Sequence, residues 1–253
     1  MKLAGQIALI TGSSRGLGEF IARRFAKEGA SVAIVSKDAT NKARKVVKDI
    51  RSCGGIADNF QADISKTSDC YKLVNQVLDS FGNVDILVNN AGIFIPQSIT
   101  ETTEKDWDNQ LDTNLKSCFF LTQAVLPNMK KNSYGKIINV SSSFGLVGHI
   151  NAGAYCASKA GLLNLTRSMC IELAPLKINI NSLAPGGAAT DLNAERRKIP
   201  GFQAAFDKAT PSGAYFMDAD GLSGAAVFLA SEEARFITGT ELVVDGGMTA
   251  RCD

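Results

Sequence analysis

The 253-residue sequence predicts a doubly wound α/β fold, with a mainly parallel, seven-stranded sheet and helices on both of its faces. Short apolar runs of strand length alternate with longer amphipathic segments along the chain, which is typical of a parallel sheet covered on both sides. The first strand leads directly into a glycine-rich turn and a helix. No linker, internal repeat or low-complexity stretch interrupts this alternation. We therefore expect residues 1–253 to form a single domain.

The apolar runs locate the strands, and the helices fall between them. The longest helical segments are Glu104–Met129 and Gly153–Leu173. Strands are expected at Ile7–Thr11, Ser31–Ser36, Ile56–Gln61, Ile86–Asn89, Gly135–Ser141, Ile178–Ala184 and Leu242–Val244. Residues 186–219 break the alternation, because they show no strand pattern and mix Pro, Gly and charge. They follow the carboxyl end of a strand, where open α/β sheets bind ligands, so we expect a substrate-binding loop there rather than a surface excursion.

The turn after the first strand contains Gly12, Gly16 and Gly18 in the spacing Gly-x-x-x-Gly-x-Gly. Glycines let the backbone turn tightly and approach a pyrophosphate, and free N–H groups at the start of the next helix attract negative charge. The spacing differs from the Gly-x-Gly-x-x-Gly of many dinucleotide-binding proteins. Alone, the motif leaves an ordinary glycine turn as an alternative. Between a strand and a helix, it predicts a Rossmann-type dinucleotide-binding fold.

A second pattern lies in the middle of the chain. Tyr155 and Lys159 are four residues apart, so they share one face of a helix. Ser142 stands thirteen residues before Tyr155, at the end of a strand, and can reach the same point. A hydroxyl, a phenol and an ammonium group that converge can transfer a proton. A lone Tyr-x-x-x-Lys is commonly a surface feature of a helix, so its weight depends on the rest of the chain.

Together, the two patterns resemble the short-chain dehydrogenase/reductase family, and the resemblance covers essentially the whole chain. It implies an oxidoreductase that moves a hydride reversibly between a nicotinamide and a carbonyl or secondary alcohol. Five further segments occur in the order typical of the family: Ala62-Asp63-Ile64, Asn89-Asn90-Ala91-Gly92, Asn114 within Asp-Thr-Asn-Leu-Lys, Pro185-Gly186-Gly-Ala-Ala-Thr190 and Val244-Asp245-Gly246-Gly247.

The resemblance also implies roles for individual residues. Tyr155 would be the general acid in reduction and the general base in oxidation, with Lys159 and an oxidised nicotinamide beside it to lower its pKa. Ser142 would hydrogen-bond the substrate oxygen, and Asn114 would hold a water that completes a proton relay. The cofactor would be bound by Tyr155 and Lys159 together with Gly12, Ser14, Arg15, Gly16, Leu17, Gly18, Ser36, Lys37, Asp63, Ile64, Asn90, Ala91, Gly92, Pro185, Gly186, Ala188 and Thr190.

The end of the second strand indicates which dinucleotide is preferred. In NAD-binding proteins an acidic side chain about 20 residues after the glycine turn holds the adenosine ribose, whereas in NADP-binding proteins basic residues hold the extra phosphate. In this sequence Ser36 takes the place of the acidic residue, Lys37 follows it, and Arg15 lies in the glycine turn. Two cations and a hydroxyl are sufficient to bind one phosphate. We therefore expect a preference for NADP(H), and Asp38 leaves NAD(H) as an alternative.

The candidate substrate residues are mostly apolar and favour a small, fairly apolar ketone or alcohol. Beside Ser142 and Tyr155 they are Phe94, Phe144, His149, Ile150, Leu192, Phe202, Phe206 and Tyr215. A reductase of 3-oxoacyl groups on acyl carrier protein is an alternative. Such enzymes typically carry arginines where Ser133 and Leu176 stand here, although Lys130, Lys131 and Lys177 are close by.

Three other classes of protein are alternatives. An NAD-dependent sugar or alcohol dehydrogenase is one of them. A nucleotide-sugar epimerase or dehydratase of this family is generally longer, with an added substrate domain. A non-enzymatic nucleotide-sensing protein usually lacks the tyrosine or the lysine, and Tyr155 and Lys159 are both present.

Charge and composition limit the kinds of binding partner and the location that we expect for this protein. The net charge is +2, with acidic and basic residues interspersed, so no nucleic-acid partner is expected. No apolar run reaches bilayer length and the first strand begins within six residues, so we expect a cytoplasmic protein without a membrane partner. Six cysteines without Cys-x-x-Cys spacing and a single histidine predict reduced thiols and no metal site. The family resemblance implies a homotetramer or a homodimer.

Overall fold

The computed structural model describes residues 1–38, 41–190 and 193–250, and its main sheet has seven strands in the order β3-β2-β1-β4-β5-β6-β9. Every neighbouring pair of strands in this sheet is parallel, which confirms the predicted fold class. Each strand lies within one residue of its predicted bounds: β1 Ile7–Ile10, β2 Ser31–Ser36, β3 Ile56–Gln61, β4 Ile86–Asn89, β5 Gly135–Val140, β6 Ile178–Pro185 and β9 Glu241–Val244.

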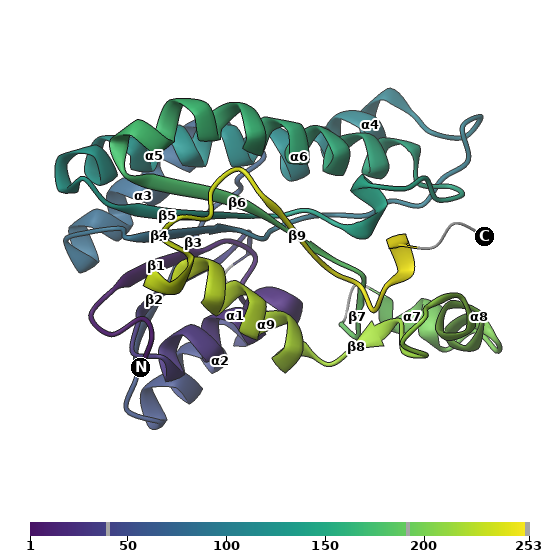
Figure 1. Ribbon diagram of the computed structural model, residues 1–253, viewed down its shortest axis with the longest axis horizontal. Coiled ribbons are helices and arrows are strands. Elements are labelled where there is room, and N and C mark those ends of the chain that lie inside the picture. The colour runs from purple at the N-terminus through teal and green to yellow at the C-terminus, as the bar shows by residue number, and fades with distance from the viewer. Residues whose placement is uncertain (39–40, 191–192, 251–253) are drawn as a thin grey trace.

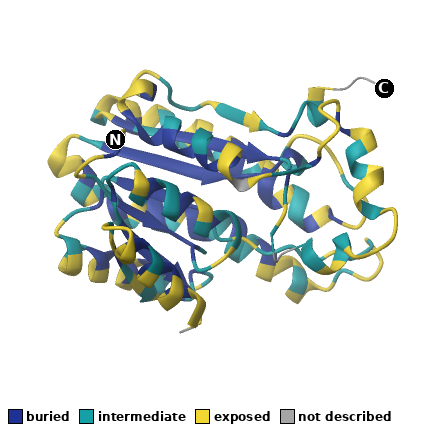
Figure 2. Cartoon of the chain, turned by 90° about the horizontal axis from the view of Figure 1, so that it is seen from below, coloured by how far each residue is buried: buried dark blue, intermediate teal, exposed yellow. Residues whose placement is uncertain are grey.

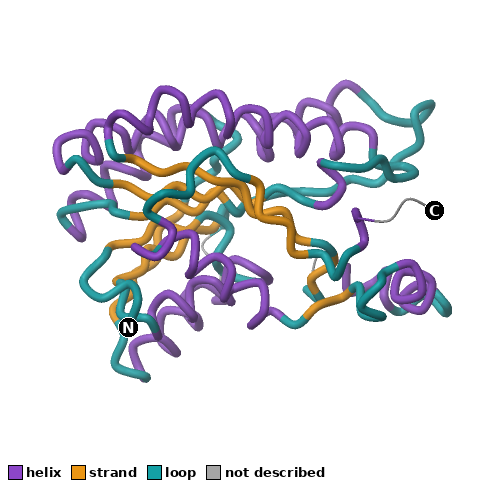
Figure 3. Tube along the Cα trace, in the orientation of Figure 1, coloured by secondary structure: helices purple, strands orange, loops and turns teal. Residues whose placement is uncertain are grey.

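Helices cover both faces of the sheet (Figures 1 and 3). On one face lie α1 (Gly16–Lys27), α2 (Asn41–Ser52) and α9 (Ala219–Ala230). On the other face lie α3 (Thr67–Phe81), α4 (Glu104–Leu111), α5 (Ser117–Asn132) and α6 (Gly153–Leu173). In the parts of the chain that the structure describes, no helix has the length and apolar character needed to cross a membrane.

Successive residues of the central strands face opposite helical layers. In β1, the side chains of Ala8 and Ile10 belong to the core beneath α1, α2 and α9, whereas Leu9 belongs to the core beneath α3 and α5. All three are fully buried, and Figure 2 shows the central strands buried between the helices. Burial on both faces explains why these strands are continuous apolar runs instead of alternating apolar and polar residues.

The strand order reverses between β1 and β4. The chain passes from β1 to β2 and β3 on one side, and then to β4, β5, β6 and β9 on the other. At such a point the loops leave the carboxyl ends of the strands in opposite directions and open a crevice for a ligand. Gly12 follows β1 and Asn90 follows β4, so two of the predicted motifs border this crevice.

The predicted helix Glu104–Met129 contains an irregular turn. α4 ends at Leu111, a five-residue π-helical turn spans Asp112–Lys116, and α5 then continues to Asn132. A π-helical turn accommodates an extra residue in the helix and often occurs at functional sites. Asn114 lies within this turn, and its side chain is fully buried.

The prediction that residues 186–219 contain no strand is wrong. β7 (Gly187–Ala188) and β8 (Phe216–Met217) pair in parallel as a separate two-stranded sheet. Between them lie the short helices α7 (Ala194–Arg197) and α8 (Phe202–Ala209), at one end of the main sheet in Figure 1. Strands of two residues have no measurable periodicity, so the sequence could not reveal them.

Candidate active site

The glycine turn after β1 uses the conformational freedom of its glycines. Gly12 and Gly16 have φ values of +63° and +60°, which other residues rarely adopt. A Cβ atom on Gly18 would lie 2.5 Å from the Gly12 carbonyl oxygen and would overlap the Asn90 side-chain amide. The turn is therefore too tight for side chains at Gly12 and Gly18, and Gly16 is required for its positive φ.

Thr11 and Asn90 fasten the loop after β4 to this turn. The Thr11 hydroxyl oxygen accepts hydrogen bonds from the backbone N–H groups of Asn90 and Ala91, both at 3.0 Å. In return, Asn90 Nδ2 donates to the Thr11 carbonyl oxygen at 2.8 Å. The two sides of the crevice are thus held at a fixed separation.

A cavity of about 1020 Å³ runs along the carboxyl edge of the sheet. Asn114, Ile150 and Leu192 apart, the residues predicted to bind the cofactor or substrate or to act in catalysis line it. They include Gly12, Ser14, Arg15, Gly16, Leu17, Gly18, Ser36, Lys37, Asp63, Ile64, Asn90, Ala91, Gly92, Phe94, Ser142, Phe144, His149, Tyr155, Lys159, Pro185, Gly186, Ala188 and Thr190. Asn114 does not line the cavity and lies behind it, and Leu192 is outside the described residues.

The turn fits a dinucleotide on structural grounds. The residue before α1, Arg15, forms no side-chain cap, so the first N–H groups of the helix have no side-chain acceptor from that position. They open onto the cavity beside Gly12, Gly16 and Gly18. Uncapped N–H groups next to an exposed glycine backbone suit a pyrophosphate.

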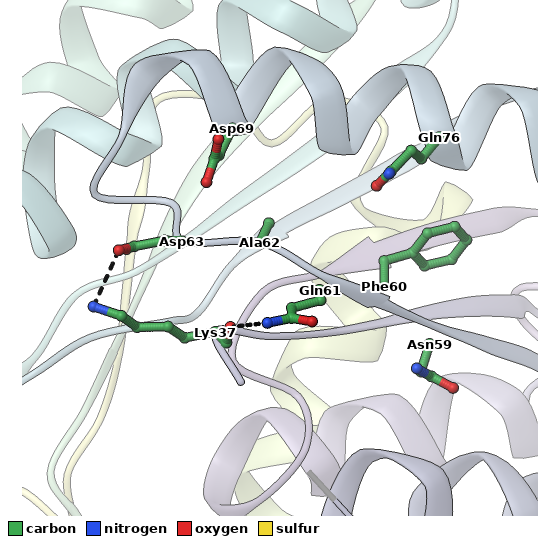
Figure 4. A pocket seen from close by; sticks show the side chains of 8 residues that line it. All are labelled: Lys37, Asn59, Phe60, Gln61, Ala62, Asp63, Asp69 and Gln76. Atoms are coloured by element: carbon green, nitrogen blue, oxygen red, sulfur yellow. Dashed lines mark hydrogen bonds and ion pairs between the residues drawn. The ribbon is translucent and has the colours of Figure 1, made fainter. Parts of the chain in front are cut away.

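One end of the cavity is rich in cations. Arg15, Lys37 and Lys42 all line it there, beside Ser36. Lys37 Nζ lies 3.1 Å from Asp63 Oδ2 (Figure 4). Burial opposes ionisation of Asp63, but hydrogen bonds from Ser65 and Lys37 outweigh it and lower the pKa of that carboxyl. Lys37 also borders a second, shallower hollow of about 590 Å³, whose lining is drawn in Figure 4.

The proton-transfer residues meet in the middle of the cavity. Ser142 follows β5, and Tyr155 and Lys159 lie in the first two turns of α6. The Phe144 N–H donates to Ser142 Oγ at 3.1 Å, a contact that uses the oxygen as an acceptor and not the hydroxyl proton. Lys159 is buried, and its Nζ donates to the Val140 carbonyl oxygen at 2.8 Å. Lys159 Nζ also lies 5.8 Å from the centre of the Tyr155 ring.

The chain alone shifts the pKa of Tyr155 in the direction opposite to that expected. Burial raises the pKa of Tyr155 to about 12, and a hydrogen bond with Ser142 opposes this only in part. Burial also lowers the pKa of Lys159 to about 8. The protein by itself keeps the Tyr155 phenol protonated, as a proton donor requires.

Asn114 acts on the backbone beside this cluster. Its Oδ1 accepts from the Ile93 N–H at 2.8 Å, and its Nδ2 donates to the Ile93 carbonyl oxygen at 2.9 Å and to Ser158 Oγ at 3.1 Å. A Cβ atom on Gly92 would lie 3.3 Å from Asn114 Oδ1 and 3.5 Å from Lys159 Nζ. Asn114 therefore holds the segment that passes directly over Lys159.

Aromatic rings form the outer part of the cavity. The Phe94 ring lies 4.8 Å from that of Tyr155, and His149 lies 4.4 Å from Phe144 and 5.9 Å from Phe206. Phe202, Phe206 and Tyr215 also line the cavity, in agreement with the sequence-based prediction. Ile150 does not, because its side chain points to solvent and is 79% exposed.

Sequence reasoning missed several polar residues of the cavity, among them Lys42, Asn193 and Arg196. Asn193 Nδ2 donates to the Ala188 carbonyl oxygen at 2.7 Å, and so fixes the chain that leaves β7. Lys42 lies in the first turn of α2, and this position after a second strand that ends in Ser-Lys was a usable signal. Arg196 lies in a four-residue helix without a pattern and gave no such signal.

Comparisons with known proteins agree with this arrangement. A family model described as short chain dehydrogenase matches residues 6–200. The 3beta-hydroxysteroid dehydrogenase 1 of Eggerthella lenta is 38% identical over 248 residues, or 98% of this chain and 95% of that protein. The 3-oxoacyl-[acyl-carrier-protein] reductase of Staphylococcus epidermidis is 36% identical over 95% of this chain and 98% of its own. A solved gluconate 5-dehydrogenase from Burkholderia cenocepacia, in complex with NADP and tartrate, has a TM-score of 0.94 and 35% identity, covering 99% of this chain and 97% of that one.

The chain therefore belongs to the short-chain dehydrogenase/reductase family. It is a dehydrogenase/reductase that acts on CH–OH groups and the corresponding carbonyls, and it uses a nicotinamide cofactor.

Proposed function

We propose that this protein is an NADP(H)-preferring reductase of a small, fairly apolar ketone, acting reversibly on the matching secondary alcohol. The observation that carries the proposal is a continuous cavity with three cations at one end, Ser142, Tyr155 and Lys159 in the middle, and aromatic rings at the other end. A nicotinamide dinucleotide in this cavity supplies or accepts the hydride.

Each residue of the central cluster has a distinct role. Tyr155 donates its phenolic proton to the carbonyl oxygen during reduction and removes a proton from the hydroxyl during oxidation. Ser142 donates a hydrogen bond to the same oxygen and stabilises the negative charge that develops on it. Lys159 supplies positive potential beside the phenol. Asn114 keeps the backbone at Ile93 in position over Lys159, and a water beside it would connect the lysine with solvent.

The preference for NADP(H) follows from charge at the adenosine end of the cavity. Arg15 is exposed, and within the described residues it forms no ion pair, so its guanidinium is available to a phosphate. Lys37 is engaged by Asp63 through a single ion pair whose lysine side chain is 67% exposed, so the lysine can turn towards a phosphate at little cost. Lys42 adds a third cation. The NADP bound to the gluconate 5-dehydrogenase relative supports the same choice.

Residues 186–219 serve as the substrate-binding loop in this proposal. They contribute Phe202, Phe206, Tyr215 and Phe216 to the cavity, opposite Phe94 and Phe144. Aromatic walls favour a ketone with an apolar body over a highly hydroxylated one. The His149 ring stacks with the Phe206 ring, so the segment after β5 contacts residues 186–219 and completes this wall of the cavity.

Reduction of a carrier-bound 3-oxoacyl group is the second candidate, and the Staphylococcus epidermidis relative supports it. The cations available for an acidic carrier protein are Lys130, Lys131 and Lys177. They lie just before β5 and β6 begin, at the amino edge of the sheet, whereas the cavity opens at the carboxyl edge. Within one chain this separation favours a free ketone.

We also propose that the protein forms a homotetramer. Trp107 on α4, Phe119 on α5 and Ile171 on α6 are 41%, 40% and 78% exposed, so the outer side of these helices carries apolar groups suited to an interface. Sedimentation at micromolar concentration tests this, and a monomeric mass would contradict it.

Fluorescence titration of the purified protein with NADPH and separately with NADH tests the cofactor proposal. We expect NADPH to bind at least about tenfold more tightly, because a phosphate paired with cations contributes charged hydrogen bonds. Equal affinities would contradict the preference. Binding of neither dinucleotide would contradict the proposed enzymatic function as a whole. If NADPH binds, a panel of apolar ketones in the reducing direction tests the reaction.

A further inference from the structure

Arg196 is a cation on the aromatic side of the cavity. It lies in α7, lines the cavity and is half-buried. Its guanidinium carbon lies 5.2 Å from the centre of the Phe94 ring and 5.6 Å from that of Phe202. The two rings come from separate parts of the chain and hold the guanidinium between them through cation–π contacts.

The neighbouring charged residues of this segment have partners, and Arg196 does not share them. Arg197 Nε donates to Asn193 Oδ1 at 2.9 Å, and Lys198 pairs with Glu195 at 2.7 Å. Among residues 1–38, 41–190 and 193–250, no carboxylate lies within ion-pair distance of Arg196. Its hydrogen-bond donors are thus available on the cavity side.

Arg196 is close to the reacting centre. Phe94, on which its guanidinium rests, is also in ring contact with Tyr155. Tyr215 lines the same part of the cavity, and its ring lies 4.5 Å from that of Phe206. A molecule whose carbonyl oxygen meets Tyr155 and Ser142 can therefore extend along Phe94 and end at Arg196.

The surroundings of Arg196 indicate which group it receives. A guanidinium is a planar fork of donors with no acceptor, and it pairs bidentately with a carboxylate. The other side chains of this wall are mainly aromatic: Phe94, Phe202, Phe206, Tyr215 and Phe216. Of the two neighbouring arginines, Arg196 lines the cavity, whereas the Arg197 guanidinium lies 5.9 Å from the Phe216 ring and is bonded to Asn193. One available positive charge matches a monoanion, whereas a dianionic phosphate would need further cations such as those at the far end of the cavity.

We propose that Arg196 binds a carboxylate of the substrate, so that the substrate is an oxo acid or hydroxy acid. An apolar ring or short chain between its carbonyl and carboxylate packs on Phe94. This inference rests on the proposed function, because it names the substrate class of the same cavity. It also reconciles aromatic walls with a charged residue, since only one end of such a molecule is ionic.

The test compares two ketones of the same shape. 4-Oxocyclohexanecarboxylate carries the anion, and 4-oxocyclohexanecarboxamide is its neutral isostere. Calorimetric titration of each into the NADP-loaded protein, and kcat/KM for each with NADPH, are measured for the natural protein, Arg196→Gln and Lys198→Gln. The Lys198→Gln control removes one positive charge two residues away, and Lys198 does not line the cavity.

We expect the acid to bind about 10- to 100-fold more tightly than the amide, as hydrogen bonds to a charged group imply. Arg196→Gln should remove this difference and leave the affinity for the amide nearly unchanged, whereas Lys198→Gln should retain it. Equal affinity for acid and amide in the natural protein, including binding of neither, overturns the inference. So does an equal loss for both ligands in Arg196→Gln.

Failure of the proposed function has a different signature. If NADPH reduces neither ketone while the acid still binds through Arg196, the proposed reaction is contradicted and the carboxylate site stands. If NADPH reduces both ketones with equal kcat/KM and they bind equally, the reaction stands and the carboxylate site is overturned.

Discussion

The side chain of Asn114 bonds both polar groups of the Ile93 peptide backbone, accepting from its N–H at 2.8 Å and donating to its carbonyl oxygen at 2.9 Å. A side-chain amide has one acceptor and one donor group in fixed relation, so it can satisfy a buried backbone position as a neighbouring strand would. This contact links the π-helical turn of one layer with the loop that follows β4. The cofactor-facing backbone is therefore positioned from the side of the helices.

Replacement of Asn114 should affect stability and cofactor binding together. Asn114→Ala leaves the Ile93 N–H and carbonyl without these partners, and we expect a loss of about 1–3 kcal/mol in the free energy of unfolding. NADPH affinity should fall with it, because Gly92 and Ile93 line the cavity. Urea unfolding and NADPH titration measure the two effects. Asn75→Ala, on the exposed side of α3, is the control and should change neither; a stable Asn114→Ala protein with unchanged affinity would contradict the positioning role.

Removal of the phenol should stop the reaction without preventing binding. Tyr155→Phe keeps the ring that contacts Phe94 but has no proton to donate, so we expect turnover to fall about 10²- to 10⁴-fold. NADPH affinity should change by less than about threefold, since the ring is preserved. Steady-state kinetics and titration on the same sample give both values. The matched control is Tyr71→Phe, on the exposed side of α3, and turnover in Tyr155→Phe at the level of that control would contradict the mechanism.

Burial of the Lys159 ammonium should lower the free energy of unfolding by an amount that depends on pH. Because the pKa of Lys159 falls from 10.5 to about 8 on folding, the unfolded chain binds more protons between these pH values, and stability attributable to this residue rises with pH across that interval. Below pH 8 the cost is present in full. We expect Lys159→Met to be inactive but more stable at pH 7 by about 1–3 kcal/mol, allowing for the lost bond to Val140.

Denaturant unfolding of the natural protein and Lys159→Met at pH 7, 8.5 and 10 checks this. The advantage of the variant should shrink as pH rises from 8 towards 10.5. An advantage that is constant over this range would show that lysine ionisation is not its cause.

Two glycine replacements should have opposite effects. Gly18→Ala forces a Cβ atom against the Gly12 carbonyl oxygen, and we expect a loss of about 1–3 kcal/mol in stability together with loss of NADPH binding. Gly224→Ala, inside α9, meets no atom within 4 Å and should stabilise the protein by about 0.5–1 kcal/mol through helix propensity. Thermal or urea unfolding ranks the pair, and the reverse order would refute the steric account of the turn.

Lys37 should discriminate between the two dinucleotides. Lys37→Ala removes a phosphate partner and leaves Asp63 unopposed, so NADPH affinity should fall about 10- to 100-fold while NADH affinity changes little. Lys27→Ala, in the last turn of α1 and away from the cavity, controls for overall charge. Equal losses for NADPH and NADH in Lys37→Ala would assign the lysine to a structural role.

Local patterns in the sequence predicted the parts of the site that depend on local structure. The glycine turn, Tyr155 and Lys159 each lie within one turn or helix, so their spacing determines their geometry. Asn114 required the family resemblance, because an asparagine in a helix has no distinctive pattern. Its π-helical turn could not be predicted, since one extra residue in a helix does not disturb apolar spacing enough to be detected.

Arg196 illustrates what lies beyond such patterns. Its position depends on Phe94 after β4 and on Phe202 in α8, and these residues meet only through the tertiary fold. The same limit applies to β7 and β8, which consist of two residues each and pair across the loop. Where side chains from short, irregular segments meet, their positions depend on tertiary contacts. The periodicity of a single sequence does not reveal such contacts.

The π-helical turn at Asp112–Lys116 also restricts how this chain can change in length. Deleting one residue there would restore a regular α-helix with better backbone hydrogen bonding. Judged by secondary structure alone, this deletion would appear harmless. Each residue of an α-helix turns its successors by about 100°, however. A shortened helix would therefore rotate α4 against α5 and withdraw the Asn114 amide from Ile93. At this point in the chain, a single-codon deletion should be far less tolerated than most amino-acid exchanges.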